Sequence, residues 1–136
     1  MLLSLQIENI AVIEKAGIEF DSGLNVLTGE TGAGKSIVID SINAVLGERA
    51  SRDLVRSGSA GAQVSALFTD ISASALSQLE ALGYSPDEEG MLLIQRQIAA
   101  DGKGSCRING QITTVSMLRS VGRILVNIHG QHENQV

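Results

Sequence analysis

Residues 29–36 have the glycine spacing and the final lysine–serine pair that a phosphate-binding loop requires. These residues are Gly29, Glu30, Thr31, Gly32, Ala33, Gly34, Lys35 and Ser36. Glycines let successive backbone N–H groups turn toward phosphate oxygens, and a following helix adds the positive end of its dipole. In such a loop Lys35 reaches the β- and γ-phosphates and the Ser36 hydroxyl ligates Mg²⁺. The pattern therefore predicts binding of ATP or GTP.

The segments on either side of this loop are those that a nucleotide-binding loop needs. Residues 24–28 form a short apolar, β-prone run, and residues 37–46 form an apolar run of helix length that ends at Gly47. Strand, loop and helix thus follow one another in the required order. The alternative, a glycine-rich turn with an incidental lysine, is strongly disfavoured by this order.

The composition is that of one folded domain outside a membrane. The chain has 136 residues, of which 43% are hydrophobic, enough to build a core. It contains no apolar run of membrane-spanning length and does not start like a secretion signal, so we expect a cytoplasmic protein. A single cysteine, Cys106, cannot form an internal disulfide, and we expect it to be a buried thiol on a strand.

The charge limits how this chain could contact nucleic acid. The net charge is −5, which argues against a surface that grips nucleic acid as a whole. The densest basic stretch contains Arg49, Arg52 and Arg56, and it suits either a solvated loop at a helix C-terminus or a local DNA contact. With no tryptophan, one tyrosine and two phenylalanines, the sequence offers no aromatic platform for stacking bases.

The spacing of apolar residues predicts an α/β fold in which antiparallel strands lie beside the nucleotide-binding strand. Alternation predicts strands over residues 3–8, 16–20, 63–68, 91–98, 105–108 and 111–113. Asn109–Gly110 is a strong hairpin signal between the last two. Leu76, Leu79 and Leu82 fit a short helix closed by Gly83 and capped by Ser72 or Ser74.

After a short helix over residues 116–121, the apolar run 124–128 suits a buried strand and residues 129–135 a polar loop at its end. Gln131 could bind Mg²⁺ through its carbonyl oxygen and a water through its NH₂ group. Zinc binding by His129, His132 and Glu133 is the weaker alternative, because the histidines lack metalloprotease spacing and no cysteine is near. A loop of local hydrogen bonds also remains open.

Two parts of a complete ATPase site are not found in the sequence. An acidic pair after an apolar strand normally positions Mg²⁺ and the attacking water, and the nearest match, Phe68-Thr69-Asp70, is poor. A Ser-Gly-Gly run that could form a second phosphate-binding loop is missing too. We therefore expect either that these parts lie on another chain or that the sequence is a piece of a longer protein.

Five stretches resemble the N-terminal head segment of the RecN family of bacterial DNA repair proteins, in the SMC-like branch of the ABC-type ATPases. They are residues 1–13, 29–36, 46–50, 107–110 and 128–135, the last containing the particular run His-Gly-Gln-His-Glu. The resemblance extends over essentially the whole chain. It implies that residues 1–136 are the N-terminal part of a head domain. This part ends just after the Q-loop, the segment that contains Gln131, where a coiled coil begins.

The same resemblance implies roles and partners. ATP is bound by residues 29–36, Ser36 and Gln131 contact Mg²⁺, and Lys35 and Gln131 are the catalytic residues. Gln131 couples nucleotide state to head movement, with Gln135 a weaker candidate. The implied partners are the C-terminal half of the same head, a second head in an ATP-dependent homodimer, and DNA through the full-length protein, with no membrane. The implied process is double-strand break repair and recombination in the bacterial cytoplasm at the nucleoid, and the isolated segment is not expected to hydrolyse ATP.

Two other classes of protein are alternatives to an ATPase head. The chain could be a self-sufficient P-loop kinase or GTPase, but it lacks a base-reading Asn-Lys-x-Asp motif and an arginine-rich lid. It could also be an interaction module that keeps nucleotide as a structural ligand. Nucleotide-dependent dimerisation separates that module from an ATPase head.

Overall fold

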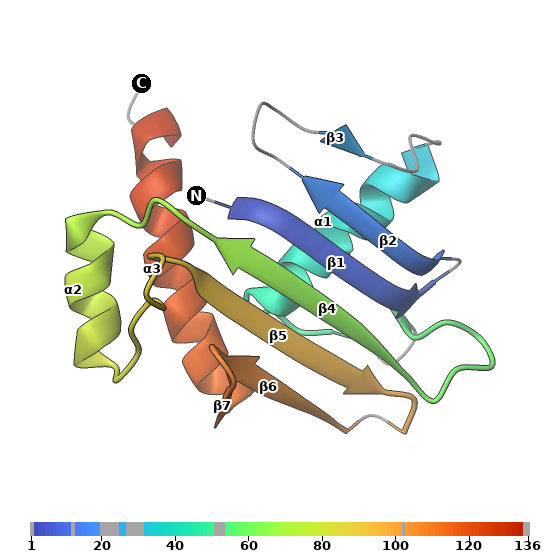
Figure 1. Ribbon diagram of the computed structural model, residues 1–136. Helices are drawn as coiled ribbons and strands as arrows, with labels where there is room; N and C mark the ends of the chain where they lie inside the picture. Colours follow the sequence, from blue (N-terminus) through green and yellow to red (C-terminus); the bar gives the residue numbers. More distant parts are fainter. Residues whose placement is uncertain are drawn as a thin grey trace.

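A computed structural model of the chain shows an antiparallel sheet covered on one face by helices (Figure 1). The structure describes residues 2–11, 13–19, 25–26, 32–50, 54–101 and 103–134, and for residues 25–26, 32–35 and 126–134 it describes the backbone. The strands are β1 (Leu2–Ile10), β2 (Ile13–Glu19), β3 (Asn25–Val26), β4 (Gly61–Phe68), β5 (Leu92–Ala99), β6 (Gly104–Ile108) and β7 (Gln111–Thr113). The helices are α1 (Gly32–Val45), α2 (Ala73–Ala81) and α3 (Val115–Asn134).

Within the described ranges the sheet has seven strands in the order β3-β2-β1-β4-β5-β6-β7, with antiparallel pairing throughout. The register is set by the alternation of side chains. Leu5 and Ile7 on β1 are fully buried, whereas Gln6 and Glu8, which alternate with them, are exposed. A one-residue slip would turn the apolar set to solvent, so burial of one face fixes the pairing.

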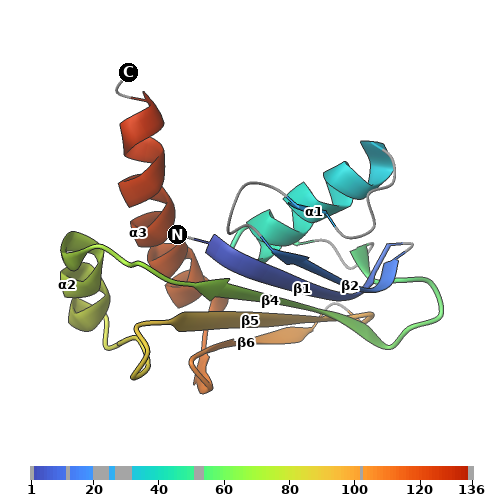
Figure 2. The same cartoon turned by 45° about the horizontal axis from the view of Figure 1, so that its top comes forward.

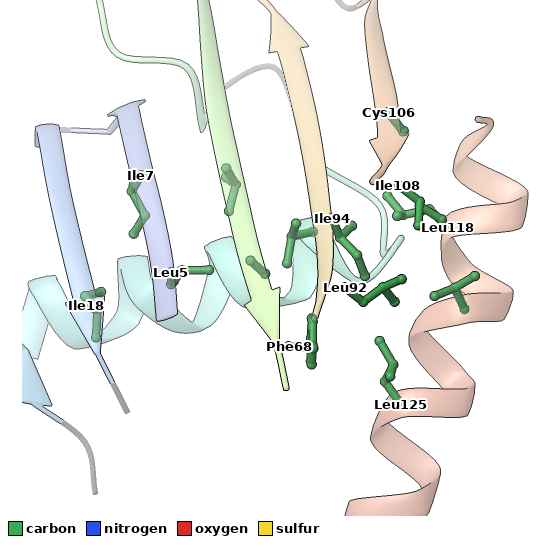
Figure 3. Packing of buried hydrophobic residues seen from close by; sticks show 14 of the residues in the cluster. Leu5, Ile7, Ile18, Phe68, Leu92, Ile94, Cys106, Ile108, Leu118 and Leu125 are labelled. Atoms are coloured by element: carbon green, nitrogen blue, oxygen red, sulfur yellow. The ribbon is translucent and has the colours of Figure 1, made fainter. Parts of the chain in front are cut away.

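Helices α1 and α3 lie over the apolar face of the sheet, α2 lies beside α3 at one end of the strands, and no described helix covers the other face (Figure 2). Side chains from α1, α2 and α3 join the strands in one core cluster, as Val38, Leu79 and Leu118 illustrate. Figure 3 shows Leu118 and Leu125 of α3 directed toward Ile108 and the neighbouring strands. Among the described helices, none combines the length and apolarity needed to cross a bilayer.

Helix α1 ends in a Schellman motif. The N–H of Glu48 donates to the Asn43 carbonyl at 3.0 Å, and the N–H of Gly47 donates to the Ala44 carbonyl at 3.1 Å. Gly47 has a φ of +92°, which glycine adopts without strain. The predicted helix and its terminating glycine are thus confirmed.

Two further local predictions are confirmed. Ser72 caps α2, accepting the N–H of Ala75 at 3.1 Å. Asn109 and Gly110 have φ values of +50° and +82°, as a tight hairpin turn between β6 and β7 requires. The Asn109 side chain also accepts the N–H of Leu93 and donates to the Ser85 carbonyl, which ties this turn to β5 and to the loop before it.

The prediction for the last part of the chain is wrong. Residues 124–128 were expected to form a strand and residues 129–135 a loop, but α3 continues from Val115 through Asn134. Leu118, Val121 and Leu125 are all buried, and their spacing is that of one helix face. Burial of this face overrides the β-propensity of Ile and Val in the run.

Candidate nucleotide-binding helix

The phosphate-binding sequence falls at the start of α1. Gly29, Glu30 and Thr31 lie outside the described residues, whereas Gly32 is the first residue of the helix. The backbone N–H groups of a first helical turn have no partner within the helix and point along its axis. Because the helix begins inside the motif, these donors face the position that an anion would take. The local backbone therefore fits a nucleotide phosphate.

Two of the described side chains near this end of α1 are exposed to solvent. Ser36 is exposed, and Ile39 keeps 53% of its surface exposed. Lys35 lies in the first turn, where the structure describes the backbone. The opposite face of the helix packs on the sheet through Val38, Ser41 and Val45. Helix α1 thus has exposed side chains at Ser36 and Ile39 while its opposite face is anchored on the sheet.

The segment after α1 is bound to the turn between β1 and β2. The N–H of Ala11 donates to the Leu54 carbonyl and the N–H of Arg56 donates to the Asn9 carbonyl, each at 2.7 Å. Asn9 and Ala11 have positive φ values of 56° and 51°. Two non-glycine residues in this strained region show that the turn is held firmly by its surroundings.

The three arginines of the predicted basic stretch follow α1, and the structure describes two of them. Arg49 is exposed, Arg56 is partly buried and Arg52 lies outside the described residues. Whether this stretch contacts DNA stays a prediction.

The C-terminal end of α1 is held by a buried arginine from β5. Arg96 is 9% exposed, and its Nη1 donates to the carbonyls of Ala44 at 2.7 Å and Glu48 at 2.6 Å. The C-terminal end of a helix carries partial negative charge, so a cation is favoured there. Burial lowers the pKa of Arg96, and the nearby Arg119 guanidinium lowers it further. Arg119 itself donates from Nε to the Gly47 carbonyl at 3.3 Å.

Helices α1 and α3 meet at two glycines. A Cβ atom on Gly47 would lie 2.5 Å from the backbone of Arg119, and one on Gly122 would lie 2.5 Å from the Leu46 carbonyl oxygen. Real Cβ atoms do not approach other atoms so closely, and the two backbones are therefore in direct contact. The start of α3 is fixed against the end of α1.

Cys106 lies opposite Arg96 in the pairing of β5 with β6 and is 2% exposed. Burial raises the pKa of its thiol, and the Arg96 charge opposes that change. The prediction of a buried strand cysteine is confirmed.

The segment with Gln131 is brought to a different place. Residues 129–134 form the last turns of α3, and Gln135 lies outside the described residues. In Figures 1 and 2 the C-terminal end of α3 and the N-terminal end of α1 lie well apart, at opposite sides of the molecule. The proposed contact of Gln131 with Mg²⁺ therefore stays a prediction.

Sequence reasoning missed Arg96 and Gly122. The signal for Arg96 was its position in β5, where Leu92, Ile94 and Ile98 share its parity and are buried. The signal for Gly122 was an isolated glycine inside an apolar helical pattern, which often marks close packing.

This arrangement can be compared with known proteins. The family model for the AAA domain matches residues 4–115. The chain belongs to this family. The AAA and SMC ATPase families imply the use of a nucleotide with Mg²⁺.

Among curated relatives the chain is similar to RecN. The DNA repair protein RecN of Halalkalibacterium halodurans is 48% identical over 136 residues, covering 99% of this chain and 24% of that protein. The DNA repair protein RecN of Bacillus subtilis is 44% identical over 137 residues, covering 100% of this chain and 24% of that protein. The chain spans about a quarter of the length of these relatives. The expected resemblance to the RecN head segment is confirmed.

Solved structures confirm the fold class. A chain from work on ATP-driven dimerization and DNA-stimulated activation of SMC ATPases matches with a TM-score of 0.69 at 26% identity, over 92% of this chain and 79% of that chain. The Smc head domain of Pyrococcus furiosus, bound to the C-terminal domain of ScpA, matches with a TM-score of 0.69 at 20% identity, over 92% of this chain and 33% of that chain. The fold is that of part of an SMC-type head lobe.

Proposed function

We propose that the chain is the ATP-binding half of an SMC-like ATPase head that acts in DNA double-strand break repair and recombination. The observation that carries the proposal is that α1 begins at Gly32, inside the phosphate-binding motif, beside an antiparallel sheet of the SMC head type. The similarity to RecN supports the process in which the head acts. The cellular site that goes with this proposal is the bacterial cytoplasm at the nucleoid.

In this proposal residues 29–36 hold the ATP phosphates through backbone N–H groups, and Lys35 adds a positive charge at the β- and γ-phosphates. The Ser36 hydroxyl ligates Mg²⁺, and its exposure near the start of α1 supports this role. Mg²⁺ neutralises phosphate charge when bound.

Hydrolysis in this proposal needs residues outside this chain. Residues 1–136 are the N-terminal part of a head domain that ends after the Q-loop. The C-terminal half of the same head supplies the acidic pair, and a second head closes over the nucleotide in an ATP-dependent homodimer. A related ATPase undergoes ATP-driven dimerization, which supports this partner. DNA is contacted by the full-length protein.

Gln131 is proposed to contact Mg²⁺ and to couple nucleotide state to head movement. Because the last turns of α3 lie well apart from the start of α1, this contact requires those turns to move toward the nucleotide. The proposal therefore includes a rearrangement at the end of α3.

The first test is ATP binding and steady-state hydrolysis by the chain with Mg²⁺, beside its Lys35→Ala variant. We expect binding by the wild type, loss of affinity of about 100-fold or more in the variant, and no turnover in either, since one charged contact to phosphate is worth up to about 3 kcal/mol. Lys103→Ala, which removes an exposed lysine in a turn, is the matched control and should bind normally. Turnover that Lys35→Ala abolishes would show a complete site and overturn the half-head assignment.

Gln131→Ala tests the division of roles. We expect the variant to bind ATP within about twofold of the wild type, because the phosphate contacts remain, and to lose hydrolysis when the chain is mixed with the C-terminal half of the head. Gln111→Ala, which changes an exposed glutamine on β7, is the control. A loss of binding in Gln131→Ala as complete as that in Lys35→Ala would refute the separate roles.

A further inference from the structure

We propose that Arg96 is a positioning residue for the nucleotide, because it fixes the C-terminal end of α1 and thereby the direction in which the phosphate-binding end of that helix points. The proposal rests on the proposed function in one respect, namely that nucleotide binds at the N-terminal end of α1. It assigns a role to a residue on β5 that lies outside the phosphate-binding motif.

Arg96 lies on the apolar face of the sheet. Its neighbours on the same face of β5, Ile94 and Ile98, are 0% and 5% exposed and belong to the apolar side of the sheet. An arginine placed there loses water, and this desolvation is the main cause of its lowered pKa. Among the described residues no carboxylate pairs with it. Its burial is compensated instead by main-chain carbonyls.

Both of those carbonyls belong to the C-terminal end of α1. One nitrogen, Nη1, donates to Ala44 in the last turn of α1 and to Glu48 just beyond the turn that ends the helix. Both acceptors belong to the Schellman motif, so the two hydrogen bonds hold the last turn of the helix and the residue after Gly47 as one unit. Arg119 adds a third contact at the Gly47 carbonyl, from α3. The end of α1 is thereby joined to β5 and to α3 at the same place.

The length of α1 turns a small tilt at its C-terminal end into a larger displacement of its phosphate-binding end. Helix α1 has 14 residues, which at 1.5 Å per residue makes a rod about 20 Å long. A tilt of about 3° about the clamped end would move the phosphate-binding end by about 1 Å. Displacements of that size are enough to weaken contacts that depend on orientation. Loosening the C-terminal end of α1 therefore affects nucleotide affinity, even though the hydrogen bonds of Arg96 lie a helix length away from the phosphate-binding end.

The test compares Arg96→Met with Arg96→Lys and with Arg107→Met as the matched control. Arg107 lies on the neighbouring strand β6 and is exposed. Methionine keeps an unbranched apolar stem but is two atoms shorter and offers no donor, whereas lysine keeps the charge on a side chain that is one atom shorter. Each variant is checked for native circular dichroism and for its unfolding temperature without ligand. The dissociation constant for ATP with Mg²⁺ is then measured well below that temperature.

We expect affinity to fall about tenfold in folded Arg96→Met, within the range of energetic coupling between distant sites in one protein. Arg96→Lys should lose about threefold, and Arg107→Met should match the wild type. A folded Arg96→Met that is less heat-stable but binds ATP as tightly as the wild type would show a structural role only and overturn the proposal. If Arg96→Met does not fold, the lysine variant decides, and unchanged affinity in it overturns the proposal.

Failure of the proposed function looks different from failure of this inference. If the wild type and Lys35→Ala bind ATP equally weakly, nucleotide does not bind at the start of α1, and the assignment of the site is wrong. If the wild type binds and Lys35→Ala does not, the site stands, and the Arg96 variants test the positioning role alone.

Discussion

At its C-terminal end α1 is held by Arg96, by Arg119 and by the contact of two glycines with α3, whereas near its N-terminal end Ser36 and Ile39 are exposed. The anchored end satisfies its carbonyls within the protein, and the other end presents a first turn that can bind a phosphate. A helix fixed at one end can thus offer unpaired donors at the other without losing its orientation. The comparison predicts that changes at the anchored end lower stability as well as ATP affinity, whereas changes at the exposed end affect binding alone.

The largest effect is expected at the crossing of α1 and α3. Gly122→Val should destabilise the fold by about 3 kcal/mol or more, because its Cβ would lie 2.5 Å from the Leu46 carbonyl oxygen. Denaturant unfolding measures this. Arg123→Val, at the adjacent exposed position of α3, should cost less than about 1 kcal/mol. Equal stability of the two variants would show that the helices do not meet as described.

A smaller effect, on binding alone, is expected at the exposed end. Ser36→Ala should weaken ATP binding about tenfold with Mg²⁺ present and leave binding without Mg²⁺ unchanged, because the hydroxyl is proposed to contact the metal. The unfolding temperature without ligand should not change, since Ser36 is exposed. Isothermal titration with and without EDTA measures both affinities. An equal loss in both conditions would remove the hydroxyl from Mg²⁺ binding.

Burial of Cys106, which lies opposite Arg96, predicts that the stability of the protein depends on pH in the alkaline range. Because burial raises the pKa of Cys106, the folded protein keeps the thiol proton at pH values where the unfolded chain has lost it. Below about pH 8.5, the pKa of the thiol in the unfolded chain, this contribution to the free energy of unfolding is fully present. It falls by at most about 1.4 kcal/mol per pH unit as the pH rises toward the pKa of the thiol in the folded protein. In Cys106→Ala the free energy of unfolding should fall less between about pH 8 and pH 10. Parallel curves for the two proteins would contradict the raised pKa.

The smallest effect is expected for Ile39, which projects from the exposed side of α1. Ile39→Ser should change the free energy of unfolding by less than about 0.5 kcal/mol, as for other surface substitutions. Denaturant unfolding beside the wild type measures the change. A loss of several times that size would mean that this side of α1 is covered in the chain.

Much of the sheet could be predicted from sequence because alternation is a local signal. In β4, Val64, Ala66 and Phe68 are buried and the residues between them are not, as the pattern requires. Ser72 and the Asn109–Gly110 pair could be predicted for a similar reason, since caps and tight turns depend on few neighbouring residues. These parts needed no knowledge of what packs against them.

Helix α3 could not be predicted in the same way. The run 124–128 is rich in β-branched residues, and a short apolar run does not distinguish a buried strand from a buried helix. Leu118, Val121 and Leu125 indicate a helix only when the window is extended, and their burial depends on β6 and α2. The segment with Gln131 was therefore assigned to a loop, whereas the structure has it in a helix.

The candidate site also has one part that local sequence predicts and one part that depends on tertiary packing. The phosphate-binding loop is recognisable because its residues are consecutive and their chemistry fixes their spacing. The hydrogen bonds that hold the end of α1 join Arg96 to the carbonyls of residues 44 and 48, and they form only once the sheet and the helix have packed. An arginine on the apolar side of a strand was the one sequence sign of them.

The place of β1 in the sheet has a consequence for how the chain folds. β1 pairs with β2 across a short turn, but its other neighbour is β4, so that Leu5 lies opposite Ala66. Strands β4 to β7 pair with neighbours in sequence, as do β1 to β3. The two groups are joined by one long-range pairing, whose loop-closure entropy makes it the slow step expected in folding. Because α1 lies within that loop, we expect the pairing of β1 with β4 to bring α1 onto the sheet in the same step.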